Sequence, residues 1–464
     1  MPLPLANTSV FAVPRSMARS DEKRLNRERR FMKMGSLQEG SVQSQSIGNV
    51  SMIWKKRTAF LGCALANYAD IQWQFGAPRT APPREFSGIM IHRRQFLLGS
   101  AATLGCWRRR ATGFPGYAFV ANGGERSVAA VDLTSFSVTR QIQLEGAPTA
   151  VVARQEQRRI YALSPQNAAI YEIDAVDLVV RRKLSLGGTA VSMRLDTGTN
   201  ALWVLCRAPH LLIRVPLENP KLQAASRLKL PGEPEDCELS RDGRMAVVSF
   251  PQMRSVALID LAKPALVNVA HAGDDPRSAL FRSDGRQVVV ANRRARMITV
   301  MDVKTGGILV KLPLPVEPEN FCVKADGGQI FITGKGMDAV VVVHPYWTEV
   351  AETVLAGHAP GAVAISAAPE YLFAANPESG DVTVLEVATR DVLAAVKVGQ
   401  EPCFITFTPD NQYALVVNHR SGDLAVIRLA TITQGGSQRR SRTAPLFTMV
   451  PVGVGPVSAA VGRF

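Results

Sequence analysis

The chain has 464 residues, 46% of them hydrophobic, and a formal net charge of +15. The charge is unevenly divided, because residues 1–113 contain 18 Lys and Arg against six Asp and Glu, which leaves 36 basic and 33 acidic residues in 114–464. The larger part is therefore nearly neutral and lacks the basic surface that nucleic-acid binding requires, so we expect no nucleic-acid partner.

Residues 1–89 show no convincing helical or strand periodicity. Their most apolar stretch, Ala59–Ala66, is too short to cross a bilayer. We expect this segment to be disordered or an over-extended N-terminus, with Met90 as a plausible start.

Residues 90–113 resemble a twin-arginine export signal. Two arginines are followed by an aromatic and an apolar residue and then by a short run of small and apolar residues. The pattern consists of Arg93, Arg94, Phe96 and Leu97. It predicts a periplasmic or secreted protein, and the apolar run is too short for a transmembrane helix. We do not expect a lipid anchor at Cys106, because Thr103 is unsuited to the position three residues before it.

Residues 117–464 contain a repeat of about 42 residues. Prolines spaced 42 residues apart begin successive units, at Pro234, Pro276, Pro318, Pro360 and Pro402. In the unit that starts at Pro402, short β-branched runs alternate with Pro, Asn, Asp and Gly turns, which is typical of four successive strands. A fixed period of this length indicates stacked supersecondary units.

The two ends of the repeat region complete one unit. The first unit, Tyr117–Leu144, supplies only second, third and fourth strands, and Val457–Val461 supplies only a first strand. We therefore predict an all-β fold, a β-propeller of eight four-stranded blades closed by a C-terminal strand that completes the N-terminal blade. Seven blades remain possible if Val191–Leu230 forms no sheet of its own.

Several second strands end in a common motif: Phe-Val-Ala-Asn at 119–122, Val-Val-Ala-Asn at 289–292, Phe-Ala-Ala-Asn at 373–376 and Val-Val-Asn at 416–418. Together with Ser-Gly-Asp-Val-Thr-Val-Leu-Glu at 379–386, these segments resemble the repeats of bacterial and archaeal YVTN-type β-propeller proteins. The resemblance covers about three quarters of the chain and implies the propeller fold. It implies no catalytic residues, because the family shares none, and proteins of this family are often exported.

Charged residues concentrate in two sets of loops that share one rim of the predicted propeller. The fourth-to-first connections are acidic, and several second-to-third connections are basic. The candidate ligand-binding residues are Glu235, Asp236, Asp274, Asp275, Glu319, His358, Glu401, Arg293 and Arg294. They could form a polar pocket at the channel mouth, with or without a cation held by the carboxylates, or they could be ordinary solvated loop residues.

Motifs for cofactors and catalysis are missing. The six cysteines form no C-x-x-C pair, and no G-x-S-x-G elbow, phosphate loop or H-E-x-x-H motif is present. We therefore predict no cofactor, and the type of any metal is unknown. His358 is the candidate if a haem-d1-type axial histidine exists.

The sequence favours an exported, non-enzymatic, monomeric binding or interaction scaffold whose partner, a protein or a small molecule, meets the propeller face. The alternative is a periplasmic enzyme, either a lactonase-like hydrolase or a haem- or metal-dependent oxidoreductase. Fold alone does not decide between them.

Overall fold

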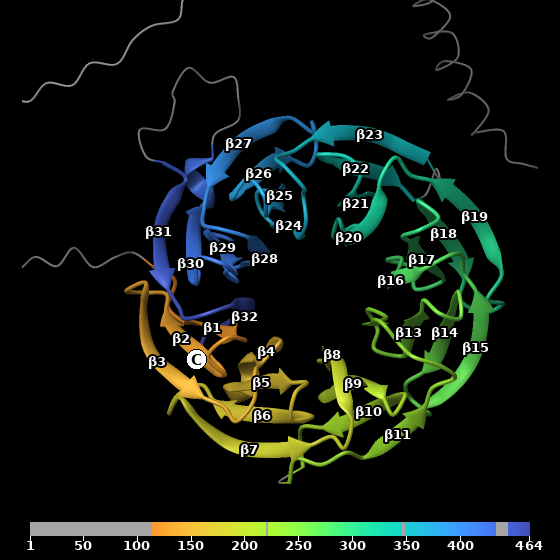
Figure 1. Ribbon diagram of the computed structural model, residues 1–464, viewed down its shortest axis with the longest axis horizontal. Helices are drawn as coiled ribbons and strands as arrows, with labels where there is room; N and C mark the ends of the chain where they lie inside the picture. The colour runs from red at the N-terminus through yellow and green to blue at the C-terminus, as the bar shows by residue number, and fades with distance from the viewer. Residues whose placement is uncertain (1–112, 220, 346–348, 433–443) are drawn as a thin grey trace, which may run out of the picture. The chain divides into compact units, whose positions relative to one another are not determined.

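Eight four-stranded antiparallel sheets form a ring around a central channel in the computed structural model (Figure 1). The structure describes residues 113–219, 221–345, 349–432 and 444–464. These residues include two short 3-10 helices, and no helix among them is long and apolar enough to cross a membrane.

The blades follow chain order, and within each the first strand lies innermost. Blade 1 contains β32 (Pro456–Gly462), β1 (Tyr117–Asn122), β2 (Ser127–Asp132) and β3 (Ser137–Gln143). Blade 2 contains β4 (Ala150–Arg154), β5 (Arg159–Ser164), β6 (Ala169–Asp174) and β7 (Val179–Ser185). Blade 3 contains β8 (Thr189–Asp196), β9 (Ala201–Ala208), β10 (Leu211–Pro216) and β11 (Ser226–Lys229). Blade 4 contains β12 (Cys237–Leu239), β13 (Met245–Phe250), β14 (Ser255–Asp260) and β15 (Ala265–His271).

The second half of the ring repeats this order. Blade 5 contains β16 (Pro276–Phe281), β17 (Gln287–Asn292), β18 (Met297–Asp302) and β19 (Ile308–Pro313). Blade 6 contains β20 (Glu317–Val323), β21 (Ile330–Lys335), β22 (Ala339–His344) and β23 (Glu349–Leu355). Blade 7 contains β24 (Val363–Ile365), β25 (Tyr371–Asn376), β26 (Asp381–Glu386) and β27 (Val392–Lys397). Blade 8 contains β28 (Pro402–Phe407), β29 (Tyr413–Asn418), β30 (Asp423–Arg428) and β31 (Leu446–Pro451).

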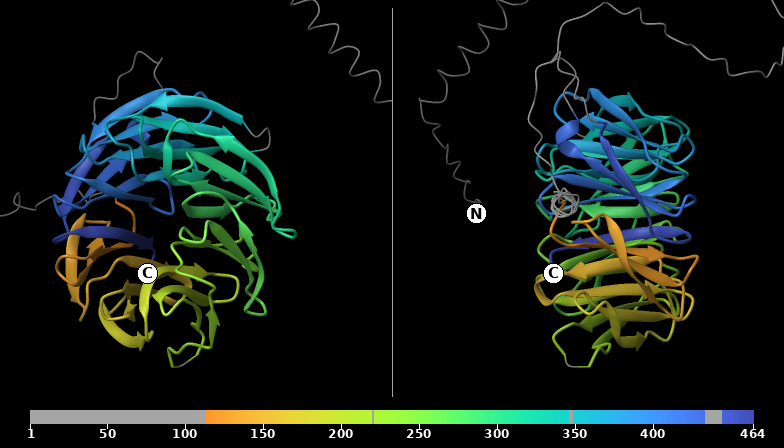
Figure 2. Two further views of the ribbon diagram at one scale, coloured as in Figure 1. Left: turned by 45° about the vertical axis from the view of Figure 1, so that its right-hand side comes forward. Right: turned by 90° about the vertical axis from the view of Figure 1, so that its left-hand side faces the viewer.

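The C-terminal strand closes the ring. β32 pairs antiparallel with β1 over six residue pairs, from Tyr117 opposite Gly462 to Asn122 opposite Pro456. Figure 2 shows this pairing as a blue strand beside an orange one. Closure removes the inner edge that blade 1 would otherwise expose. The predicted eight blades are confirmed, and the seven-blade alternative is wrong because residues 189–229 form a complete sheet of their own.

The core lies between the blades. Eight clusters of buried apolar side chains occur in the described chain, one between each pair of neighbouring blades. Second and third strands are buried on both faces, as in β5 and β6, whereas the fourth strand β7 alternates with solvent. The ring is thus stabilised mainly by contacts between sheets, and the inner strands are left to line the channel.

The asparagine of the repeated motif ties the blade to its loop. Asn292 is fully buried at the end of β17 and donates from Nδ2 to Oγ1 of Thr299 on β18 at 2.9 Å. Gly273, in the loop that enters the blade, lies against this amide and has a φ of +142°, so a Cβ there would meet Oδ1 of Asn292 at 2.6 Å. The asparagine of the motif therefore has a structural role, because its side chain packs against the loop that enters the blade.

Candidate functional site

The two sets of charged loops lie on one face of the ring, here called the upper rim. The backbone N–H of Arg293, after β17, donates to the carbonyl of Asp275, before β16, at 3.0 Å. The equivalent bond in blade 8 runs from His419 to Glu401 at 2.9 Å. These bonds place second-to-third and fourth-to-first loops side by side, as the sequence predicts.

Asp275 is the centre of the charged cluster. It adopts a left-handed backbone, with a φ of +59°, immediately before Pro276, and it is buried. Its carboxylate meets Arg277 at 3.2 Å, Arg293 at 3.0 Å and Arg294 at 3.8 Å. A buried carboxylate needs such partners, and aspartate tolerates the left-handed region better than most residues.

Ion pairs extend from this centre to the neighbouring blades. Arg277 reaches Glu235 of blade 4 at 2.6 Å, and Arg293 approaches Glu319 of blade 6 at 3.9 Å. Arg207 of blade 3 and Lys335 of blade 6 extend these contacts, at 2.9 Å from Glu235 and 3.4 Å from Glu319, and Arg207 also lies 3.1 Å from Glu233. We call this group the rim network; it consists of Arg207, Glu235, Asp275, Arg277, Arg293, Arg294, Glu319 and Lys335.

The rim network supplies cations to its own carboxylates. Glu235, Asp275 and Glu319 each contact at least two basic side chains. Within the described ranges, no group of three or more His, Cys, Asp or Glu side chains is arranged to hold a metal ion. The geometry therefore does not support the cation that the sequence left open at this rim, and it favours a ligand that hydrogen-bonds to the paired charges.

The remaining predicted residues lie around the same rim but are not part of this network. Asp274 pairs with Arg254 at 3.3 Å in a recess of about 200 Å³ beside it. Glu401 lies in a separate shallow groove between blades 8 and 1, with His419 and Arg420.

His358 lies on an exposed loop before blade 7. Its Nδ1 is 2.9 Å from Asp338, and its Nε2 is 2.7 Å from Glu378. The hydrogen bond and the charge of Asp338, with that of Glu378, raise the pKa of His358 above 6.5. Because both ring nitrogens face carboxylates, this geometry does not present His358 as an axial ligand.

A polar recess opens at the channel mouth, inside the rim network. This recess, here called the mouth recess, has a volume of about 380 Å³. It is lined by Val191, Ser192, Glu235, Asp236, Arg277, Ser278, Arg293 and Glu319. Arg194 on β8 reaches across to blade 4, at 3.1 Å from Asp236 and 3.0 Å from Glu238. Burial raises the pKa of Asp236 and outweighs the opposing effect of Arg194.

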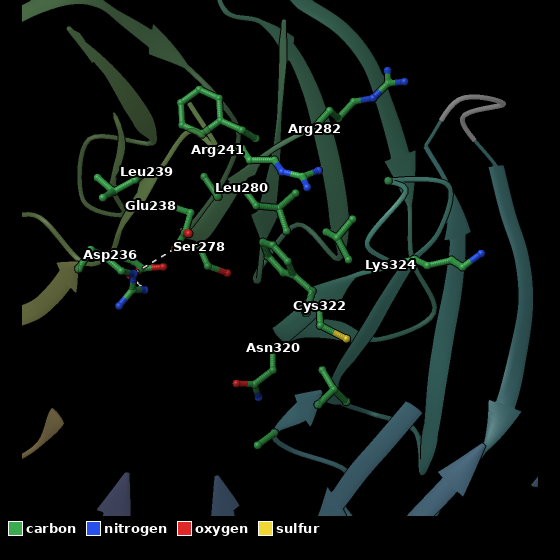
Figure 3. A pocket seen from close by; sticks show the side chains of 18 of the residues that line it. Asp236, Glu238, Leu239, Arg241, Ser278, Leu280, Arg282, Asn320, Cys322 and Lys324 are labelled. Carbon is green, nitrogen blue, oxygen red and sulfur yellow. Dashed lines mark hydrogen bonds and ion pairs between the residues drawn. The ribbon is translucent and has the colours of Figure 1, made fainter. Parts of the chain in front are cut away.

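The recess continues into a larger cavity in the channel, of about 840 Å³ (Figure 3). Figure 3 shows Asp236, Ser278 and Asn320 along its wall, from three successive blades. Leu280 and Cys322 line it farther down, and Phe404 of blade 8 contributes to the same cavity. Volumes of this size are typical of small-molecule sites.

Four side chains occupy one equivalent position, at or just before the start of successive inner strands. Ser278, Asn320 and Ser192 each follow a β-bulge at the start of the strand, and Asp236 stands two residues after Pro234 as Ser278 does after Pro276. We call this set the polar arc: Ser192, Asp236, Ser278 and Asn320, from blades 3 to 6. The equivalent residues of blades 7 and 8 are Ala362 and Phe404.

Sequence reasoning missed the parts of the site that lie on inner strands. Arg194, Arg277 and the two serines of the polar arc were not among the candidates. The sequence does contain a signal for the polar arc, because Asp236, Ser278 and Asn320 each stand two residues after the repeat proline. Alternation alone does not show which face of an inner strand meets the channel and which meets the core.

Residues 162–365 match the family model of the YNCE-like beta-propeller. A search of curated protein sequences gave no match. Among solved structures, the chain is similar to dihydro-heme d1 dehydrogenase NirN in complex with DHE, with 14% identity, a TM-score of 0.60 and coverage of 74% of this chain and 75% of that one. It is also similar to Kuenenia stuttgartiensis hydrazine synthase, with 17% identity, a TM-score of 0.49 and coverage of 62% of this chain and 99% of that one.

At these identities the likeness to solved structures concerns the fold alone. The narrower resemblance to YVTN repeats stays a prediction. The chain is thus a β-propeller in which residues 162–365, from β5 of blade 2 to β24 of blade 7, match the YNCE-like beta-propeller model.

Proposed function

We propose that this chain is an exported, non-enzymatic propeller of the YVTN repeat type that binds a small molecule in the mouth recess and the channel cavity. The observation that carries the proposal is the continuity of the two spaces, since Asp236, Ser278 and Glu319 line both. Binding sites of this kind combine convergent polar groups with an apolar wall. Here the rim network and the polar arc supply the polar groups, and Leu280 and Phe404 contribute to the apolar wall.

Export rests on the sequence alone. The signal residues Arg93, Arg94, Phe96 and Leu97 lie outside the described residues. The proposal places the propeller in the periplasm or outside the cell, as a monomer.

A protein partner on the upper rim and an enzymatic role are the alternatives. The exposed Arg294 and Lys335 could contact a protein, but a recess open to the channel suits a small ligand better. Less supports an enzymatic role. Among the described residues, no group of three or more His, Cys, Asp or Glu side chains is placed to hold a metal ion, and both ring nitrogens of His358 contact carboxylates.

The proposal is tested by thermal unfolding of the full chain with a small-molecule library of sugars, amino acids, dicarboxylates, nucleotides and haem. A ligand at a hundredfold excess over its Kd stabilises the folded state by about 2.7 kcal/mol. The variant Ser278→Trp fills the junction of recess and cavity and should lose this shift. Ser135→Trp, in the exposed turn between β2 and β3, is the matched control and should keep it. A library without any stabilising compound, or an equal shift in Ser278→Trp, would contradict the proposal.

A further inference from the structure

The wall of the channel cavity, which blades 3 to 8 form, has a polar side and an apolar side. At the level of the polar arc, blades 3 to 6 present two hydroxyls, a carboxylate and an amide. Blades 7 and 8 present Ala362 and Phe404 at the same level, and all but Ser192 line the one cavity. A ligand that fills it must therefore form hydrogen bonds on one side and apolar contacts on the other.

The charges around the mouth recess are balanced. Three carboxylates, Glu235, Asp236 and Glu319, meet three guanidiniums, Arg194, Arg277 and Arg293. A ligand with a net charge finds no uncompensated partner within the mouth recess and would have to break an ion pair that is already made there. Arg241, which has no ion pair among the described residues, lines only the channel cavity. A neutral ligand leaves these pairs intact and can hydrogen-bond to their remaining donors and acceptors.

Hydrogen-bonding groups of the polar arc are also unsatisfied. The hydroxyl oxygens of Ser192 and Ser278 have no hydrogen-bond partner among the described residues, and they are so deeply buried that a side-chain rotation has to turn them toward a ligand. The Asn320 amide is exposed to the channel, and none of the hydrogen bonds within the described chain involves it. Buried polar groups normally have partners, so the arc has capacity for a ligand that both donates and accepts.

We propose that the ligand of this site is a neutral, polyhydroxylated molecule, a sugar or a related polyol. Each hydroxyl of such a molecule donates and accepts, which matches the mixed set of serine, carboxylate, amide and guanidinium groups. The C–H face of a sugar ring is apolar and suits the Phe404 side of the cavity. This inference rests on the proposed function and adds the ligand class to it.

The test uses the full chain and saturation-transfer NMR with D-glucose, D-galactose and maltose as neutral probes. D-glucuronate and D-glucosamine are the anionic and cationic probes of the same shape. We expect signals from at least one neutral sugar and weaker or no signals from its charged analogues. Calorimetry should then show that Asn320→Leu weakens binding by roughly tenfold, the loss expected for about one hydrogen bond.

Ser458→Ala is the matched control, because Ser458 has the equivalent position on β32 and also lacks a hydrogen-bond partner, but it lies outside the polar arc. Its affinity should equal that of the unchanged protein. Tighter binding of glucuronate or glucosamine, or no binding of any neutral sugar, overturns the inference. In that case the proposed function survives if another library compound stabilises the protein but not Ser278→Trp, and it fails with the inference if none does.

Discussion

Deletion of residues 456–464 should unfold the ring, because it removes β32 from blade 1. Six residue pairs join β32 to β1. An antiparallel ladder of that length holds about six backbone hydrogen bonds, each contributing roughly 0.5–1.5 kcal/mol net, or about 3–9 kcal/mol together. The deletion also exposes apolar residues of β1 such as Ala118 and Val120, which are fully buried. Because a domain's net stability is only about 5–15 kcal/mol, we expect loss of cooperative folding or aggregation.

Circular-dichroism melting and size-exclusion chromatography measure this outcome. A synthetic peptide of residues 454–464 added in trans should partly restore the melting transition. A soluble, monomeric truncation with an unchanged Tm would refute the closure by β32 and the energetic reasoning built on it.

Deletion of residues 434–442, which lie outside the described residues, is a control of the same length. The β30–β31 ladder, from Asp423 opposite Pro451 to Ile427 opposite Leu446, uses none of them. Eight residues would remain between these strands, compared with four between β2 and β3. We expect the Tm to change little, and a large drop would show that this segment supports the blade.

Three further predictions concern single side chains. Because Asp338 raises the pKa of His358, NMR titration of the folded protein should give a His358 pKa above 6.5, and this pKa should fall in Asp338→Asn. The contribution of the pair to stability is complete below the unfolded-state pKa and is lost as the pH rises through the folded-state pKa. A His358 pKa that is not shifted would contradict this pairing. Burial raises the pKa of Cys403 to about 11, so this thiol should react with a disulfide reagent at pH 8 far more slowly in the folded chain than in denaturant, and equal rates would show an open position. Glu172 is buried against two partly exposed arginines, so Glu172→Gln should lower the free energy of unfolding by about 2–3 kcal/mol in denaturant titration, a loss between those of an exposed and a fully buried ion pair. The control Glu145→Gln removes an exposed ion pair and should lower it by less than about 1 kcal/mol. Equal losses in the two variants would contradict the role of burial.

The repeat was predictable because its spacing is a direct consequence of the fold. In seven of the eight blades a proline stands at the start of the inner strand or up to three residues before it, and the missing strand at one end of the region matches the extra strand at the other. Blade 3 was the uncertain unit, since it has neither the repeat proline nor an Asp-Gly turn. Its sheet forms nevertheless, because residues such as Trp203 and Leu205 pack against blade 4.

The site was predictable only in its loops. Charge next to the repeat proline is visible in the sequence, so Glu235 and Asp275 in the loops and Glu319 at the start of β20 were predicted. The partner Arg277 and the hydroxyl of Ser278 lie on an inner strand, where one face meets the channel and the other the core. Which face is which depends on the β-bulge between Pro276 and Ser278, and a bulge is set by tertiary pairing that the local sequence does not display.

Hydrogen–deuterium exchange with and without the stabilising ligand tests the central claim, that the polar arc and mouth recess form the binding site. We expect the ligand to slow exchange in the inner strands β8, β12, β16 and β20 and in the loop that contains Arg293. Slower exchange confined to the groove around Glu401 and His419, or to the outer strands, would place the ligand elsewhere and contradict binding at the polar arc.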